Sequence, residues 1–108
     1  DLQFADGTPV RFWGVNICSQ QPFSPAKRVD DWVNWLAYYG VNGVRFHKFS
    51  WYLANQPASS TLYDTALMHR MDYFHAQLKQ RGIYTGWSHI YGHRVQPGDS
   101  SQLLAYEE

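Results

Sequence analysis

Gly40-Val-Asn-Gly-Val-Arg-Phe-His-Lys-Phe49 is the stretch on which the fold prediction depends. Its apolar residues Val44 and Phe46 alternate with two polar ones, Arg45 and His47. A strand here therefore places apolar side chains on one face and two polar donors on the other. An edge strand with its polar face in water explains this alternation as well as a functional surface does. The flanking segments must decide between them.

Two segments have the spacing of a helix with one buried stripe. The first repeats apolar residues at i, i+3, i+4 and i+7: Val29, Trp32, Val33 and Leu36. The second repeats them at i, i+4, i+7 and i+11: Leu67, Met71, Phe74 and Leu78. These patterns predict helices over residues 26–39 and 64–81. Gly40 and Gly82 follow as C-terminal caps that can take positive φ.

Strands are predicted over residues 10–17, 43–49 and 83–89, and a short hairpin with its turn at Asp6-Gly7 precedes the first. The first strand is expected to end at Asn16, whose side chain could point into a site at the carboxyl end. Segments 50–62 and 90–100 carry turn residues and are predicted to be long loops. Residues 101–108 are expected to begin a third helix.

Strands that alternate with helices of this length predict parallel βαβ units in an α/β fold. Either a barrel or a doubly wound sheet could contain them. No G-x-G-x-x-G fingerprint follows the first strand, which disfavours nucleotide binding. A full eight-stranded α/β barrel uses about 250 residues, and this chain has 108.

The composition directs attention to local features. Nine basic and nine acidic residues cancel, so there is no general attraction to nucleic acid or to an anionic membrane. No apolar run approaches the roughly 20 residues of a membrane span. Aromatic residues make up 18% of the chain, which suits either a carbohydrate ligand or ordinary core packing. The single cysteine, Cys18, is expected to be a small buried hydrophobe.

Three runs resemble the amino-terminal third of clan A glycoside hydrolases, and within that clan the cellulase-like members of glycoside hydrolase family five. They are Asp6-Gly-Thr-Pro-Val-Arg-Phe-Trp-Gly-Val-Asn16, Trp35-Leu-Ala-Tyr-Tyr-Gly-Val-Asn-Gly-Val-Arg-Phe-His47 and Leu78-Lys-Gln-Arg-Gly-Ile-Tyr84. The resemblance implies the first third, about three βα units, of a (β/α)₈ TIM barrel that spans residues 1–108 as a partial domain. It implies retaining hydrolysis of β-linked poly- or oligosaccharides without a cofactor or metal, and a secreted or periplasmic location.

In that family the two catalytic glutamates follow the fourth and seventh strands, beyond the three strands predicted here. The chain is therefore expected to supply substrate-site residues and to be inactive alone. The open edges of its sheet would need the remainder of the barrel, or self-association, to cover them. None of the nine acidic residues lies at the carboxyl end of a predicted strand.

The resemblance also assigns roles to individual residues. Arg45 matches the arginine on the second strand that hydrogen-bonds the nucleophilic carboxylate, which keeps that carboxylate ionised and in place. His89 matches a histidine that lines the sugar subsite, although Trp87-Ser88-His89 stands where the family commonly shows Asp-x-His. His47 lies two residues beyond Arg45 on the same strand face. Each of the three could instead be a hydrogen-bonded structural residue, but Arg45 and His89 are predicted to converge at the carboxyl end of the sheet.

The predicted loops after the second and third strands carry further candidates. In a barrel such loops lie at the catalytic face, where an aromatic ring can stack on a pyranose. Trp51 and Tyr91 are the substrate-binding candidates, with Tyr52 and His93 beside them, and packing within the loops is the alternative.

Other classes are less well supported by the sequence. A metal-dependent barrel would need paired histidines on the first strand, which has none, so His47, His89 and His93 form an incomplete ligand set. A hydrolase with a G-x-S-x-G elbow is disfavoured because that motif is absent. A non-catalytic carbohydrate-binding or interaction module remains the alternative, although such modules are usually all-β.

Overall fold

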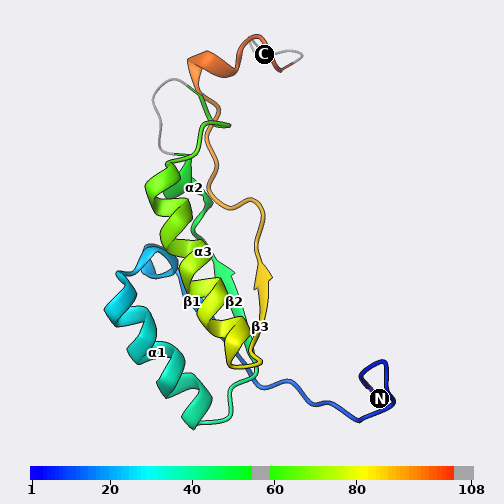
Figure 1. Cartoon of the computed structure of the whole chain (residues 1–108). Coiled ribbons are helices and arrows are strands. Elements are labelled where there is room, and N and C mark those ends of the chain that lie inside the picture. Colours follow the sequence, from blue (N-terminus) through cyan, green and yellow to red (C-terminus); the bar gives the residue numbers. More distant parts are fainter. Residues whose placement is uncertain (55–58, 104–108) are drawn as a thin grey trace.

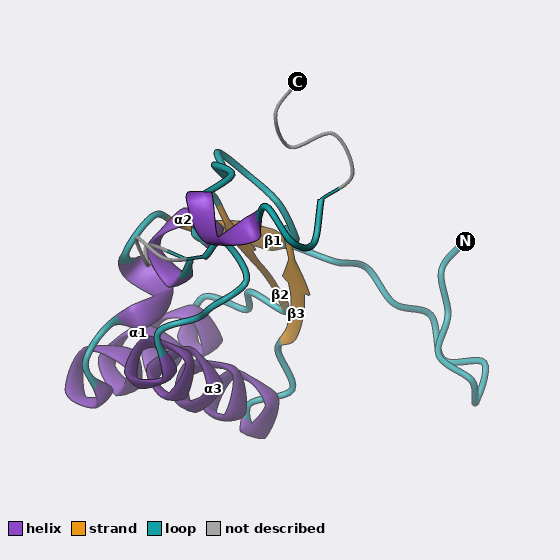
Figure 2. Cartoon of the chain, turned by 90° about the horizontal axis from the view of Figure 1, so that it is seen from above, coloured by secondary structure: helices purple, strands orange, loops and turns teal. Residues whose placement is uncertain are grey.

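The computed structural model describes residues 1–54 and 59–103. Its centre is a three-stranded parallel sheet in the order β1-β2-β3, made of Gly14–Cys18, Gly43–His47 and Tyr84–Trp87. Helix α1 (Ala26–Tyr38) joins β1 to β2, and α3 (Thr65–Gln80) lies between β2 and β3. Both helices lie on one side of the sheet (Figure 1), as the view from above in Figure 2 also shows. The predicted mixed α/β class and parallel strand order are confirmed.

The core lies between the two helices and the sheet. The predicted stripes bury Val29, Val33 and Leu36 from α1 and Met71, Phe74 and Leu78 from α3. Val44 and Phe46 meet them from β2. The Phe74 ring lies 5.3 Å from that of Phe46 and 6.2 Å from that of Trp32, both edge to face. Full burial of an apolar side chain of this size contributes about 1.5 to 3 kcal/mol, so this layer supplies most of the stability.

Asn42, just before β2, fixes the amino-terminal edge of the sheet. Its side-chain Oδ1 accepts from the Trp13 backbone N–H at 2.8 Å, and its Nδ2 donates to the Arg11 carbonyl at 2.8 Å. Its own carbonyl accepts from the Tyr84 backbone N–H at 3.0 Å. Asn42 therefore holds the backbone just before β1, and the first residue of β3, next to the start of β2.

The first strand differs from the prediction at both ends. It begins at Gly14, not at residue 10, and the residues just before it are held chiefly by Asn42: the Asn42 side chain bonds to residues 11 and 13, and the Asn42 backbone N–H donates to the Trp13 carbonyl at 3.1 Å. It continues to Cys18, so Asn16 lies in mid-strand and the expectation that the strand ends there is wrong. Cys18 is half-buried, not buried as expected. The hairpin before it is reduced to one antiparallel bridge, Gln3 to Pro9.

The connecting segments also differ in part. The segment predicted as a loop over 50–62 begins with a helical turn, α2 (Ser50–Leu53). Short 3₁₀ turns occur at η1 (Gln21–Phe23) and at η2 (Pro97–Asp99), the latter within the loop predicted over 90–100. Residues 101–103 are not helical, and the rest of the predicted terminal helix, 104–108, lies outside the described residues. None of the helices in the described ranges is long and apolar enough to cross a membrane.

Candidate functional site

The sheet face turned away from the helices carries the polar residues of the strands. Arg45 and His47 lie on this open face, because they alternate with the buried Val44 and Phe46. The parallel register places Asn16 of β1 opposite Arg45, and Cys18 opposite His47. The predicted candidates Asn16, Arg45 and His47 therefore share one surface.

Ser88 joins Arg45 to His47. Its backbone N–H donates to the Phe46 carbonyl at 2.9 Å, which extends the β2–β3 ladder one residue past β3. Its Oγ accepts from Arg45 Nε at 3.0 Å and lies 2.8 Å from His47 Nδ1. The three side chains form one hydrogen-bonded row near the carboxyl end of the open face.

Arg45 is predicted to converge with His89, but the residue that hydrogen-bonds Arg45 in the described structure is Ser88. Strand alternation gives the reason: Gly86 is opposite Arg45, so Ser88, two residues on, is the next residue of β3 on the same face. His89 is exposed and makes no hydrogen bond with any of the residues that the structure describes. Sequence reasoning missed Ser88 because it followed the histidine of the resembled motif.

His47 sits in positive surroundings. Burial, and then the charges of Arg45 and Lys48, hold the pKa of His47 below its ordinary value of 6.5. The ring of Tyr91 meets the imidazole edge to face at 5.4 Å, and the Lys48 ammonium lies 5.0 Å from the centre of that same ring. Near neutral pH the imidazole is therefore uncharged and suited to hydrogen bonding with its two distinct nitrogens.

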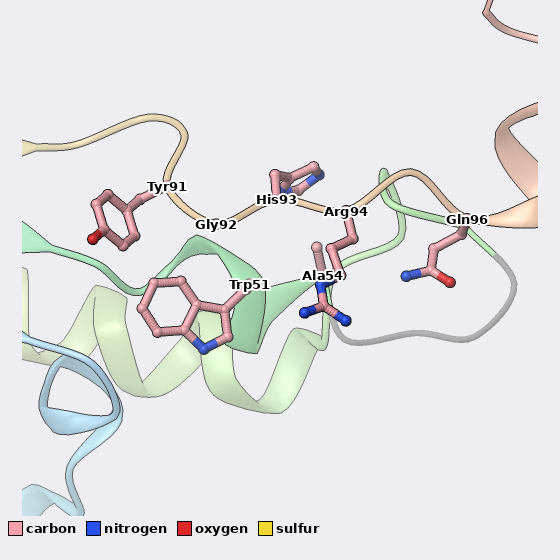
Figure 3. Close-up of a pocket in the computed structure, with 7 residues that line it drawn as sticks. All are labelled: Trp51, Ala54, Tyr91, Gly92, His93, Arg94 and Gln96. Carbon is pink, nitrogen blue, oxygen red and sulfur yellow. The ribbon is translucent and has the colours of Figure 1, made fainter. Parts of the chain in front are cut away.

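Beside this row, the segments after β2 and β3 enclose a pocket of about 410 Å³. Its lining, drawn in Figure 3, comes from α2 and from the segment after β3: Trp51, Ala54, Tyr91, Gly92, His93, Arg94 and Gln96. The predicted candidates Trp51 and Tyr91 thus line one cavity. Their ring centres are 5.5 Å apart, and Trp51 also packs on Tyr52 at 5.1 Å. Trp51 is half-buried by these contacts, which fix its indole in place.

Hydrogen bonds join the segment after β2 to the segment after β3. Ser50 Oγ donates to the Tyr91 carbonyl at 3.1 Å and accepts from the Tyr91 N–H at 3.0 Å. His93 Nε2 lies 3.0 Å from the Ser60 carbonyl, and since a carbonyl only accepts, Nε2 carries the proton. His93 Nδ1 is buried and has no partner among the described residues.

A buried carboxylate also joins these two segments, and the sequence did not suggest it. Asp99 is 2% exposed, and its oxygens accept from the Ser59 hydroxyl at 2.8 Å and from the backbone N–H groups of Ser60 at 2.8 Å and Gln96 at 2.7 Å. These donors, with the Gln96 N–H first among them, lower the pKa of Asp99 from its ordinary 3.8 to about 2. The carboxylate is fully used in holding the loops, so it is unsuited to proton transfer near neutral pH.

The site as a whole offers donors and aromatic surface. In the described ranges, the buried carboxylate is that of Asp99, and no three His, Cys, Asp or Glu side chains gather as a metal site would require. Comparison with known proteins gave no match to a family model, a curated protein or a solved structure. A functional proposal for this chain therefore rests on its sheet and loops.

Proposed function

We propose that this chain is the amino-terminal part of a (β/α)₈ barrel that belongs to a retaining glycoside hydrolase, and that it supplies substrate-site residues for β-linked poly- or oligosaccharides. The observation that carries the proposal is the row Arg45, Ser88 and His47 on the open face of the sheet, next to the aromatic pocket. Catalytic residues of such barrels come from the carboxyl ends of strands and the loops that follow them.

The strand order supports a barrel over a doubly wound sheet. A doubly wound sheet reverses its strand order at a switch point and places helices on both faces. Here the strands follow in chain order, β1-β2-β3, and α1 and α3 lie on one side (Figure 2). Repetition of this βα unit with the same handedness curves the sheet toward closure, with the open face inside. The polar row would then point into the barrel mouth.

Arg45 is suited to hold a carboxylate in that interior. Its Nε is used by Ser88, and its terminal amino groups make no hydrogen bond with a described residue. A guanidinium beside a carboxylate keeps that carboxylate ionised and fixes its orientation, as a nucleophile requires. His47 and the pocket residues could then contact sugar hydroxyls and ring faces.

The carboxylates that do the chemistry must come from elsewhere in such an enzyme. A retaining mechanism needs two carboxyl groups about 5 to 5.5 Å apart. Among the described residues the buried carboxylate near the pocket is Asp99, and its oxygens are occupied by three donors. This favours a supporting role for the chain, and it also keeps open the alternative of a non-catalytic carbohydrate-binding module.

Hydrolysis assays separate the two. The polypeptide encoded by the complete reading frame and the 108-residue chain are each purified and given aryl β-glycosides, soluble β-glucans and mannans. We expect turnover by the complete polypeptide and none by the 108-residue chain. Sugar binding by both without turnover by either would favour the binding module. Turnover by the short chain that is lost on changing one of its acids would show that the catalytic pair has been misplaced.

A further inference from the structure

The row on the open face contains a residue to which neither motif nor resemblance gave a role. We propose that Ser88 is a positioning residue: its hydroxyl fixes His47 in the tautomer with the proton on Nε2 and anchors the guanidinium of Arg45 through Nε. Both groups then present N–H donors in fixed directions on the open face. The inference deepens the proposed function, and its kinetic consequence rests on that function.

The position of Ser88 is set by the backbone. Its N–H bonds to the Phe46 carbonyl at 2.9 Å, directly after the register pair Phe46 and Trp87. The residue is therefore held like a strand residue opposite His47, with its side chain on the face of Arg45. Gly86, which is opposite Arg45, leaves this part of the face open, since even a Cβ there would meet nothing within 4 Å.

The protons of the row can be assigned from the chemistry of the three groups. Arginine Nε is a donor only, so the Ser88 oxygen accepts from Arg45 at 3.0 Å. The Ser88 hydroxyl has one proton of its own, and the acceptor within reach is His47 Nδ1 at 2.8 Å. A neutral imidazole that accepts at Nδ1 carries its proton on Nε2. The donors then run in one direction, from Arg45 to Ser88 to His47, and each bond polarises the next.

The surroundings of His47 favour this neutral form. Arg45 lies on the same strand, Lys48 follows directly, and the Tyr91 ring covers one side of the imidazole at 5.4 Å. No carboxylate accepts a hydrogen bond from His47 among the residues that the structure describes. An imidazolium would face two cations here, so the imidazole is better placed as an acceptor at Nδ1.

The consequence is that the part of the open face formed by His47 and Arg45 is a surface that offers donors. Nε2–H of His47 and the terminal amino groups of Arg45 have no acceptor among the described residues. Such a surface suits the oxygen of a carboxylate or of a sugar hydroxyl that accepts hydrogen bonds. Ser88 has no proton left to donate to a substrate, because its one hydroxyl proton is used within the row. Its effect on a substrate would therefore act through His47 and Arg45.

Nitrogen-15 NMR of the 108-residue chain tests the assignment without any need for hydrolysis. In the wild type near neutral pH, His47 should show a protonated Nε2 and an unprotonated Nδ1 with the shift of a hydrogen-bonded acceptor. The Arg45 Nε–H should exchange slowly with water. In Ser88→Ala, the Nδ1 resonance should move to that of a free acceptor, and Arg45 Nε–H exchange should accelerate about tenfold. Ser88→Thr, which keeps the hydroxyl, should restore both signals.

Thr85→Val is the matched control. Thr85 is on the same strand but faces the helices, where its hydroxyl lies 2.9 Å from Nδ1 of a different histidine, His75. This variant should change His75 and leave His47 unchanged, whereas Ser88→Ala should do the reverse. A wild-type His47 protonated at Nδ1, or a Ser88→Ala variant with unchanged His47 and Arg45 signals, would overturn the proposal. The tautomer of His47 in the wild type still tests the proposal if a variant does not fold.

A kinetic test of Ser88 uses the polypeptide from the complete reading frame. Ser88→Ala should lower kcat about tenfold and change KM little, and Ser88→Thr should recover most of the loss. A loss confined to KM would show that Ser88 acts on binding alone and would overturn the positioning role. If no variant and no wild type hydrolyses a glycoside, the proposed function fails while the NMR result still decides the role of Ser88.

Discussion

The two faces of the sheet are stabilised by different interactions. The face toward α1 and α3 is closed by apolar side chains such as Val44, Phe46 and Phe74. The open face has few large apolar contacts and holds its side chains by hydrogen bonds, with Ser88 at the centre. Stability is therefore concentrated on one face of the sheet and the proposed site lies on the other, so substitutions on the two faces should have different effects.

The largest expected effect is on the helix-covered face. Phe74→Ala removes a fully buried ring that packs on Phe46 and Trp32, and such deletions cost about 3 to 5 kcal/mol. A domain with a stability of about 5 to 15 kcal/mol would lose much of it. Urea unfolding measures the loss. Tyr84→Ala on the open face removes a ring that is 55% exposed, and should lower the free energy of unfolding by about 1 kcal/mol. Equal costs for the two would contradict the division between faces.

A smaller effect is expected where the pocket requires glycine. Gly92 has φ +63°, and a Cβ there would lie 3.2 Å from Trp51 Cε3. Gly92→Ala should therefore cost about 1 to 2 kcal/mol and shift the Trp51 fluorescence. Gly86→Ala is the matched control, because its Cβ would meet nothing within 4 Å. We expect Gly86→Ala to be neutral or stabilising, and a Gly92→Ala variant that behaves like it would contradict the packing described for Trp51.

The hydrogen bonds to the Asp99 carboxylate should be lost in acid before the helix-covered core unfolds. Because folding lowers the pKa of Asp99 to about 2, its contribution to stability is present above about pH 4 and is lost as the pH falls through 2. Hydrogen exchange at the Ser60 and Gln96 amides, which donate to the carboxylate, should accelerate over that range. Asp99→Ala, which removes both acceptor oxygens, should show fast exchange at both amides already at neutral pH. Protection of these amides that persists in Asp99→Ala would remove the carboxylate from its assigned role.

The smallest effect should come from the surface of α1. Lys27 and Asp31 form an ion pair at 3.7 Å, and their side chains are 92% and 69% exposed. Water and salt screen such a pair, so Asp31→Asn should change the free energy of unfolding by less than about 0.5 kcal/mol. A larger loss in urea unfolding would mean that stability is not concentrated in the buried layer.

The helix-covered face could be predicted from the sequence because its signals are local. The stripe from Val29 to Leu36 and the helix-ending Gly40 both lie within one short segment. The pairing of Ser88 with His47 depends on the register between two strands, which no local pattern shows. The strand predicted over 83–89 also ends earlier, at Trp87. Asp99 was placed in a late loop, but its partners lie about 40 residues earlier, and no local pattern indicates such a contact. Contacts between distant segments with no periodicity were therefore the ones missed.

The measurement that most directly tests the assignment of function to the open face is turnover by the polypeptide from the complete reading frame with Arg45→Ala. Loss of the charge that would hold the nucleophile should lower kcat/KM on an aryl β-glycoside by about 100-fold or more, with thermal unfolding unchanged. Arg70→Ala, which removes an exposed arginine from α3, should retain wild-type turnover. Wild-type turnover in Arg45→Ala, or an equal loss in both variants, would contradict the placement of the functional site on the open face.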